Sequence, residues 1–274
     1  MTEHHFETHQ PVQLYVELGR GTVQVHATET TESSVTVTGR DADDVRVDLS
    51  GDELSVIGPK ARQTLFGGDS GHQVVITVPS RSSLVTRLGS ADLAARGDLA
   101  TGRLKAGSGE IRVESLTGPS LVETGSGGVR IERVAADLRL RSGSGDVHLG
   151  HCAGEVSVST GSGDVDIDTA EGIVSAKTGS GDLTVGTAGH DVTLSTASGD
   201  LRIGSARRGV LRTKSASGDI RVGIPAGVPV WTDVSTVSGR ISSDLQGAGQ
   251  PEQGAPYVEV RATTVSGDVV LSQI

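Results

Sequence analysis

Apolar and polar positions recur with one long, fixed period through the middle of the chain. A motif of the type Gly-Ser-Gly-Asp, followed by apolar, polar and apolar residues, returns every 18 residues. Self-similarity at a fixed period is typical of stacked repeats, in which each unit buries its apolar side against its neighbours. The serines of the regular series are Ser90, Ser108, Ser126, Ser144, Ser162, Ser180 and Ser198, and looser copies follow at Ser217, Ser238 and Ser266.

Alignment of the 18-residue units shows four apolar columns and one column of small residues. The apolar columns are Leu138, Val156, Val174 and Val192; Leu140, Val158, Ala176 and Leu194; Val147, Val165, Leu183 and Leu201; and Leu149, Ile167, Val185 and Ile203. The small column is Cys152, Ala170, Ala188 and Ala206. The period of two within each unit predicts half-buried strands. It directs the residues between the columns to solvent, among them Arg139, Arg141, His148, Asp166, Lys177, Thr184 and Arg202.

Two architectures could produce these columns, a parallel coil or an antiparallel meander with hairpins at each glycine motif. In a coil, like residues stack at the inter-strand spacing of about 4.8 Å, so identical units suffice. A meander would form an open sheet that needs a second layer, and no segment resembles one. The sequence therefore predicts an all-β fold, a single-stranded parallel β-helix (β-solenoid) with about 18 residues per turn. Because crossovers between parallel strands of one sheet are almost always right-handed, we predict a right-handed β-helix. Two or three strands per turn are both compatible with the pattern.

The regular pattern does not extend over the whole chain. Residues 1–80 carry alternating segments with irregular connections, so we predict an irregular β region that caps the array. Residues 81–274 are predicted to form the solenoid, with surface insertions near 224–230 and 246–256, where prolines and glycines interrupt the columns.

Charge and cysteine content narrow the choice of partner and compartment. The chain has 34 acidic and 24 basic residues, a formal net charge of −10, which opposes nonspecific attraction to nucleic acids and anionic membranes. No apolar run resembles a signal peptide or a membrane span. Cys152 is the single cysteine and cannot form an internal disulfide. Proteins without disulfides are common in reducing compartments. We therefore expect a cytoplasmic protein that binds neither nucleic acid nor membrane.

One ladder of carboxylates could carry chemistry. We interpret these aspartates as turn residues that accept backbone N–H bonds beside glycines. The alternative is Ca²⁺ binding, because calcium takes six to eight oxygen ligands. The candidate residues are Asp146, Asp164, Asp182, Asp200 and Asp219.

The remaining motifs give no catalytic or cofactor site. Gly-Ser-Gly lacks the third glycine and the following helix of a nucleotide-binding turn. The eight histidines lack partners at metal-ligand spacing. Aromatic residues, at 2% of the chain, are too few to suggest a sugar-processing cleft. We therefore predict no catalytic residue, metal or cofactor.

The sequence resembles a family of uncharacterised bacterial β-strand-repeat proteins, generically called putative adhesins and known as a domain of unknown function. The resemblance rests on the repeated SGSGD units, on Pro229–Gly239 and on Arg261–Val269. It implies a β-solenoid and supplies no reaction or catalytic residue.

Together these patterns indicate a non-enzymatic scaffold or protein-interaction module. The alternatives are an adhesin or carbohydrate-binding protein and, less favoured by the residues, a carbohydrate-active enzyme. Loops carry recognition, so Leu65 and Phe66 in the loop Gly58–His72 are predicted interaction residues. Val269 and Leu271 are predicted to form an open edge on the last turn, which would pair with a second copy in a homodimer.

Overall fold

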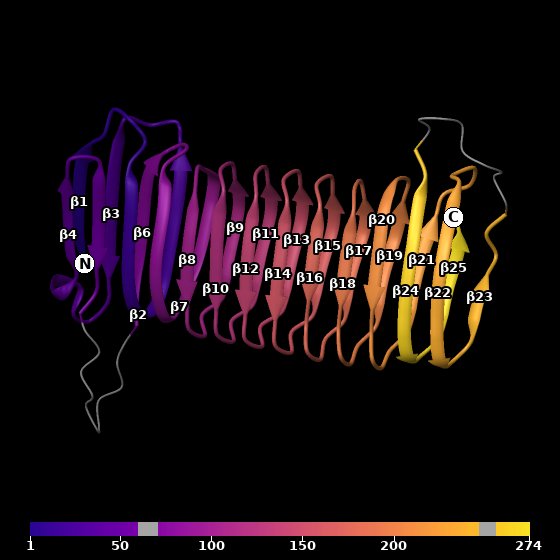
Figure 1. Cartoon of the computed structure of the whole chain (residues 1–274). Helices are drawn as coiled ribbons and strands as arrows, with labels where there is room; N and C mark the ends of the chain where they lie inside the picture. Colours follow the sequence, from indigo (N-terminus) through magenta and orange to yellow (C-terminus); the bar gives the residue numbers. More distant parts are fainter. Residues whose placement is uncertain (60–70, 247–255) are drawn as a thin grey trace, which may run out of the picture. The chain divides into compact units, whose positions relative to one another are not determined.

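The chain is built almost wholly from β-strands (Figure 1). The computed structural model describes residues 1–59, 71–246 and 256–274. The chain forms two compact units, an N-terminal unit, Met1–Ala136, and a C-terminal unit, Asp137–Ile274. Within the described ranges the single helix is the short 3₁₀ turn Ala42–Asp44, and no helix is long and apolar enough to cross a membrane.

The C-terminal unit contains two parallel sheets, and each turn of the chain contributes one strand to each of them. The first sheet consists, in spatial order, of β12 (Leu138–Ser142), β14 (Val156–Thr160), β16 (Val174–Lys177), β18 (Val192–Ser195), β20 (Gly209–Lys214), β24 (Val258–Ser266) and β22 (Val230–Ser238). The second sheet consists of β13 (Val147–Cys152), β15 (Val165–Ala170), β17 (Leu183–Ala188), β19 (Leu201–Ala206), β21 (Ile220–Ile224), β25 (Val269–Gln273) and β23 (Ile241–Ser243).

The strand register confirms the columns read from the sequence. Leu138 pairs with Val156, Val156 with Val174 and Val174 with Val192, each 18 residues apart and each buried. The pairs are parallel, which agrees with the predicted coil and not with a meander. The fold class, a β-solenoid with 18 residues per turn, is therefore confirmed, and this unit uses two strands per turn.

The glycine motifs allow successive turns to lie close together. At Gly199 φ is +154°, and a Cβ there would collide with the carbonyl oxygen of Gly181 in the preceding turn. Side chains at the same corner also tie turns together, because the Thr196 hydroxyl donates to the Gly181 carbonyl at 3.2 Å. The repeated Gly-Ser-Gly is therefore a requirement of stacking.

The N-terminal unit combines parallel turns with antiparallel strands. Its strands are β1 (Thr2–Glu7), β2 (Gln13–Thr28), β3 (Glu32–Thr38), β4 (Arg46–Ser50), β5 (Glu53–Ile57), β6 (His72–Pro79), β7 (Ser83–Leu99), β8 (Gly102–Ala106), β9 (Ile111–Leu116), β10 (Ser120–Thr124) and β11 (Val129–Val134). The long strand β2 pairs in parallel with β7 from Gln13 to His26. The antiparallel pairs are β1–β3, β3–β6 and β4–β5. Parallel stacking of this kind thus includes β2, while the antiparallel strands make the region up to residue 80 irregular.

The last turns of the C-terminal unit are not stacked in the order of the sequence. β24 pairs with β20 on one side and with β22 on the other, and β25 lies in the same way between β21 and β23. Val269 and Leu271 are therefore buried inside the stack, so their expected position at an open edge is wrong. Among the described strands, β22 and β23 form that edge instead, each with one pairing partner.

Candidate functional site

The outer face of the first sheet in the C-terminal unit carries a continuous strip of basic and hydroxyl side chains. Two outward columns of strands β12 to β24 define this strip, and the backbone register aligns them. The columns are Arg139, Ser157, Ser175, Thr193, Arg212 and Arg261, and Arg141, Ser159, Lys177, Ser195, Lys214 and Thr263. All 12 positions are Lys, Arg, Ser or Thr, so the strip contains no carboxylate, apolar or aromatic side chain.

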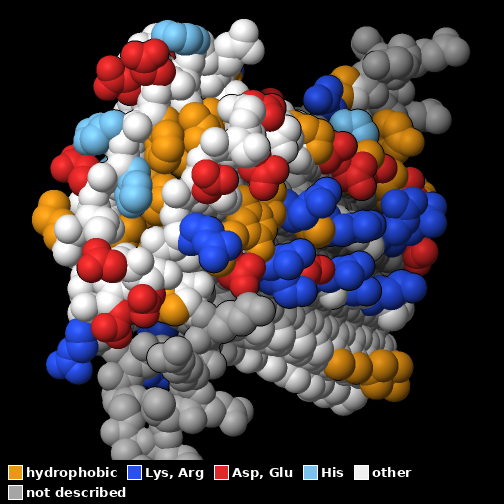
Figure 2. Space-filling model, turned by 90° about the vertical axis from the view of Figure 1, so that its left-hand side faces the viewer, with side chains coloured by type: hydrophobic (Ala, Val, Ile, Leu, Met, Phe, Trp, Pro, Cys, Tyr) orange, Lys and Arg blue, Asp and Glu red, His pale blue; other side chains and the backbone are white. Residues whose placement is uncertain are grey.

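The cations of the strip are exposed and largely without acidic partners. Arg139, Arg141, Lys177, Arg212 and Lys214 are exposed to solvent. Within the described residues of this unit, the ion pair on the strip joins Arg261 to Glu259. Figure 2 shows Lys and Arg side chains gathered on part of the visible face, with carboxylates between and beside them. The strip therefore presents a positive surface on a protein whose net charge is −10.

Acidic residues flank the strip in a third outward column at the start of the strands, and Asp233 on β22 lies in register beside Arg261. Asp137 Oδ1 accepts a hydrogen bond from the Glu155 backbone N–H at 3.0 Å. Asp191 Oδ1 accepts one from the Val210 backbone N–H, also at 3.0 Å. These two carboxylates each use an oxygen to connect successive turns, and neither forms an ion pair with a cation of the strip within the described residues.

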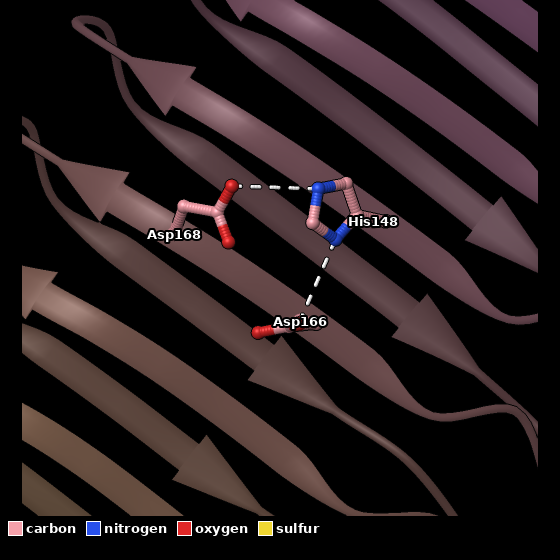
Figure 3. Close-up of side chains that lie close together, drawn as sticks. All are labelled: His148, Asp166 and Asp168. Atoms are coloured by element: carbon pink, nitrogen blue, oxygen red, sulfur yellow. Dashed lines mark ion pairs between the residues drawn. The ribbon is translucent and has the colours of Figure 1, made fainter.

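The second sheet differs, because several of its ionisable groups face one another. His148 on β13 lies between Asp166 and Asp168 on β15 (Figure 3). Its Nδ1 is 3.6 Å from Asp166 Oδ2, and its Nε2 is 3.4 Å from Asp168 Oδ2. On β21, Arg221 pairs with Asp200 at 3.1 Å and with Asp219 at 2.8 Å.

The cluster of His148, Asp166 and Asp168 is not predicted by spacing, because its members belong to different turns. One atom from each residue could approach a single cation, since these atoms lie within 4.8 Å of one another. The two ring nitrogens, however, face different carboxylates. This geometry fits an imidazole bridging two carboxylates better than three ligands around one ion, and we interpret the cluster as an ion-pair group.

The predicted role of the aspartate ladder in the turns is confirmed by its hydrogen bonds. Asp164 Oδ1 accepts the backbone N–H of Asp182 at 2.8 Å, and Asp182 Oδ1 accepts that of Asp200 at 2.7 Å. The same bond, between 2.8 and 3.0 Å, connects Asp146 to Asp164, Asp200 to Asp219 and Asp219 to Asp268. Each carboxylate thus holds the next turn of the coil.

The thiol of Cys152 lies in the small interior column, as predicted. Its side chain is fully buried. Burial, followed by the negative charge of Asp168, raises the pKa of the Cys152 thiol to about 12. A thiol of this kind is an inert core group, because the thiolate is the nucleophile.

The other predicted interaction residues have different outcomes. Leu65 and Phe66 lie outside the described residues, so their role stays a prediction. The basic strip was missed by sequence reasoning, although its signal is present in the aligned units. A net charge summed over the chain hides it, whereas the outward columns read one by one would have shown it.

The chain aligns over its whole length with several solved structures. A putative lipid binding protein from Parabacteroides distasonis has a TM-score of 0.44 and 15% identity, and the alignment covers 100% of this chain and 96% of that one. A putative adhesin from Bacteroides fragilis has a TM-score of 0.41, 12% identity and the same coverages. A putative cell adhesion protein from Clostridium sporogenes has a TM-score of 0.25 and 10% identity, over 100% and 99% of the two chains. No curated protein matches the sequence. The family model Toastrack DUF4097 matches residues 13–272.

Proposed function

We propose that this chain, which belongs to the Toastrack DUF4097 family, is a non-enzymatic protein-interaction module that binds its partner through the basic strip. The observation that supports this proposal is a difference in ion pairing between the outer faces of the two sheets. On the second sheet His148 lies between two carboxylates and Arg221 pairs with two others, although Arg202 has no ion pair among the described residues. Five cations of the strip have no acidic partner within the described residues of the unit.

The strip suits binding better than catalysis. Its side chains are basic or hydroxyl groups at repeating positions of a parallel sheet, and it offers no carboxylate or histidine to move a proton. Exposed charges of one sign attract a complementary surface and accelerate its approach. The repeated strands behind the strip hold these groups at fixed spacing.

Co-purification with matched variants tests the proposal. The strip variant Arg141→Gln/Arg212→Gln removes two cations of the strip. The control variant Arg202→Gln/Arg207→Gln removes two exposed arginines outside the strip and changes the net charge equally. We expect the strip variant, purified from the native cell, to lose a partner that the wild type and the control retain. Identical partners for both variants would contradict the proposal.

We also propose a cytoplasmic location for this module. Its single cysteine is buried and free, as is common in proteins of reducing compartments. Cell fractionation with antibodies to the chain tests the location, and recovery in the surface fraction would favour an adhesin instead.

A further inference from the structure

We infer that the strip binds an extended, acidic segment of a partner polypeptide, rich in Asp and Glu. This inference rests on the proposed function, because it names the chemistry of the partner that the strip would recognise. It goes further by specifying how the charges, the spacing and the length of the strip select that partner.

The charge of the strip requires an anionic ligand of moderate charge density. Its six cations are Arg139, Arg141, Lys177, Arg212, Lys214 and Arg261, one of which is already paired with Glu259. The chain as a whole carries −10, which repels a long, densely charged polyanion. A short acidic segment can contact the strip without bringing a large negative charge near the rest of the surface.

The spacing of the cations fits carboxylates along an extended peptide. In the second column of the strip, Arg141, Lys177 and Lys214 occupy every second strand. Two inter-strand spacings amount to about 9.6 Å. In the extended polyproline II conformation, with three residues per turn and a rise of about 3.1 Å, every third side chain lies on the same face about 9.3 Å from the last. An acidic residue at every third position would therefore meet each cation.

The length of the strip also matches a short linear segment of polypeptide. From β12 to β24 there are five inter-strand spacings, or about 24 Å, which an extended peptide covers with about seven residues. Ser159 and Ser195 lie between the cations of this column, and Ser157, Ser175 and Thr193 lie beside them. Their hydroxyls can donate hydrogen bonds to carboxylates or peptide carbonyls and are small enough to leave the surface open.

The same features disfavour other anionic partners. Phosphates of DNA follow one another at about 3.4 Å along each strand, far closer than the cations of a column. Single-stranded nucleic acids are also bound by stacking on aromatic side chains, and the strip has none. It likewise has no apolar side chain to insert into a membrane interface.

Fluorescence anisotropy with the purified full chain tests this inference. The probe is a labelled ten-residue peptide with Glu at every third position and Ser between, and the same peptide with Gln in place of Glu is the ligand control. At low ionic strength we expect binding of the Glu peptide alone. Exposed ion pairs are individually weak and screened by salt, so affinity should fall about tenfold in the strip variant and also on raising the salt concentration. The control variant Arg202→Gln/Arg207→Gln should bind like the wild type.

Several outcomes would overturn the inference. They are no binding of the Glu peptide at low salt, equal loss of affinity in the strip and control variants, or equal binding of the Gln peptide. Strip-dependent binding of duplex DNA, of heparin or of phosphatidylserine vesicles without the Glu peptide would assign the strip to another class of ligand. If the strip variant does not fold, Lys177→Gln/Lys214→Gln repeats the test. Failure with the peptide, while co-purification still depends on the strip, would refute this inference and leave the proposed function standing.

Discussion

Each aspartate of the ladder holds the backbone of the next turn, so its loss should affect stability and not metal affinity. Replacing Asp164 by Ala removes the acceptor of the Asp182 N–H. We expect a loss of about 1 kcal/mol in the free energy of unfolding, as for a lost capping group. Chemical denaturation measures it, and Asp164→Asn, which keeps the oxygen, should lose less.

Calcium provides the complementary test at the same residues. One oxygen of each ladder carboxylate is already engaged by a backbone donor, so we expect no Ca²⁺ binding by calorimetry. Micromolar, saturable binding that disappears in Asp164→Ala would show that the ladder is a calcium site.

Cys152 should be unreactive as long as the C-terminal unit is folded. Because burial raises the pKa of its thiol to about 12, the thiolate is scarce at pH 8. A thiol reagent such as a disulfide dye should react slowly in buffer and quickly in denaturant. The raised pKa favours the folded state below the unfolded pKa of about 9, and this contribution is lost as the pH rises toward 12. Rapid labelling of the native protein at pH 8 would contradict this account.

Single residues show how far the sequence can specify the structure. The burial of Leu138 and Val156 and the roles of Asp164 and Cys152 followed from the 18-residue columns, because every unit repeats the same contacts. The cluster of His148, Asp166 and Asp168 did not, because it depends on differences between two turns. A repeat alignment averages such differences away.

Each strand of the solenoid buries only a few side chains, so the loss of one of them should lower the free energy of unfolding. Ile167 on β15 is fully buried, between Leu149 and Val185 of the neighbouring turns. We expect Ile167→Ala to cost about 2–5 kcal/mol by leaving a cavity. Thermal or chemical unfolding measures this, and Asp166→Ser on the outer face of the same strand is the control. A loss under about 1 kcal/mol would show that the neighbouring turns collapse into the space.

The open edge at β22 and β23 revises the expected dimer contact. Trp231, Val237 and Ile241 on these strands are 53%, 82% and 48% exposed. Open strand edges pair readily with other chains, so we expect self-association through β22 and β23. Val237→Lys/Ile241→Lys should reduce it in light scattering over a concentration series, whereas Ile173→Lys, at an exposed apolar site just before β16, should not. A monomeric wild type at high micromolar concentration would refute it.

The order of the last turns shows where sequence reasoning fails at the level of elements. The motifs at Ser217, Ser238 and Ser266 follow one another in the chain, and their spacing predicts successive turns. In the structure Ser266 bridges to Ser217 and pairs with Ser238, so the third motif stacks between the other two. Spacing identifies the units but carries no information on which unit each one contacts.

For the whole molecule, the net charge does not reveal how positive and negative side chains are distributed over the surface. A net charge of −10 coexists with a strip that contains no acid. We expect neutralising the strip with Arg141→Gln/Arg212→Gln to leave the unfolding free energy within about 0.5 kcal/mol of the wild type, because these exposed residues lack ion-pair partners in their described surroundings. Denaturant titration measures this change. A large destabilisation would mean that the strip serves the fold and not a ligand.

The interleaved turns also bear on how the chain is made. A ribosome releases β22 and β23 before β24 and β25, yet the later pair lies directly against β20 and β21. Val230 and Gly209 both pair with Val258, so a nascent β22 could occupy the place of β24 in the same register. The native arrangement therefore requires that β22 and β23 stay unpaired until β24 and β25 are made, or that β24 and β25 displace them. The two earlier strands thus compete with the last two for the same sheet edges during synthesis.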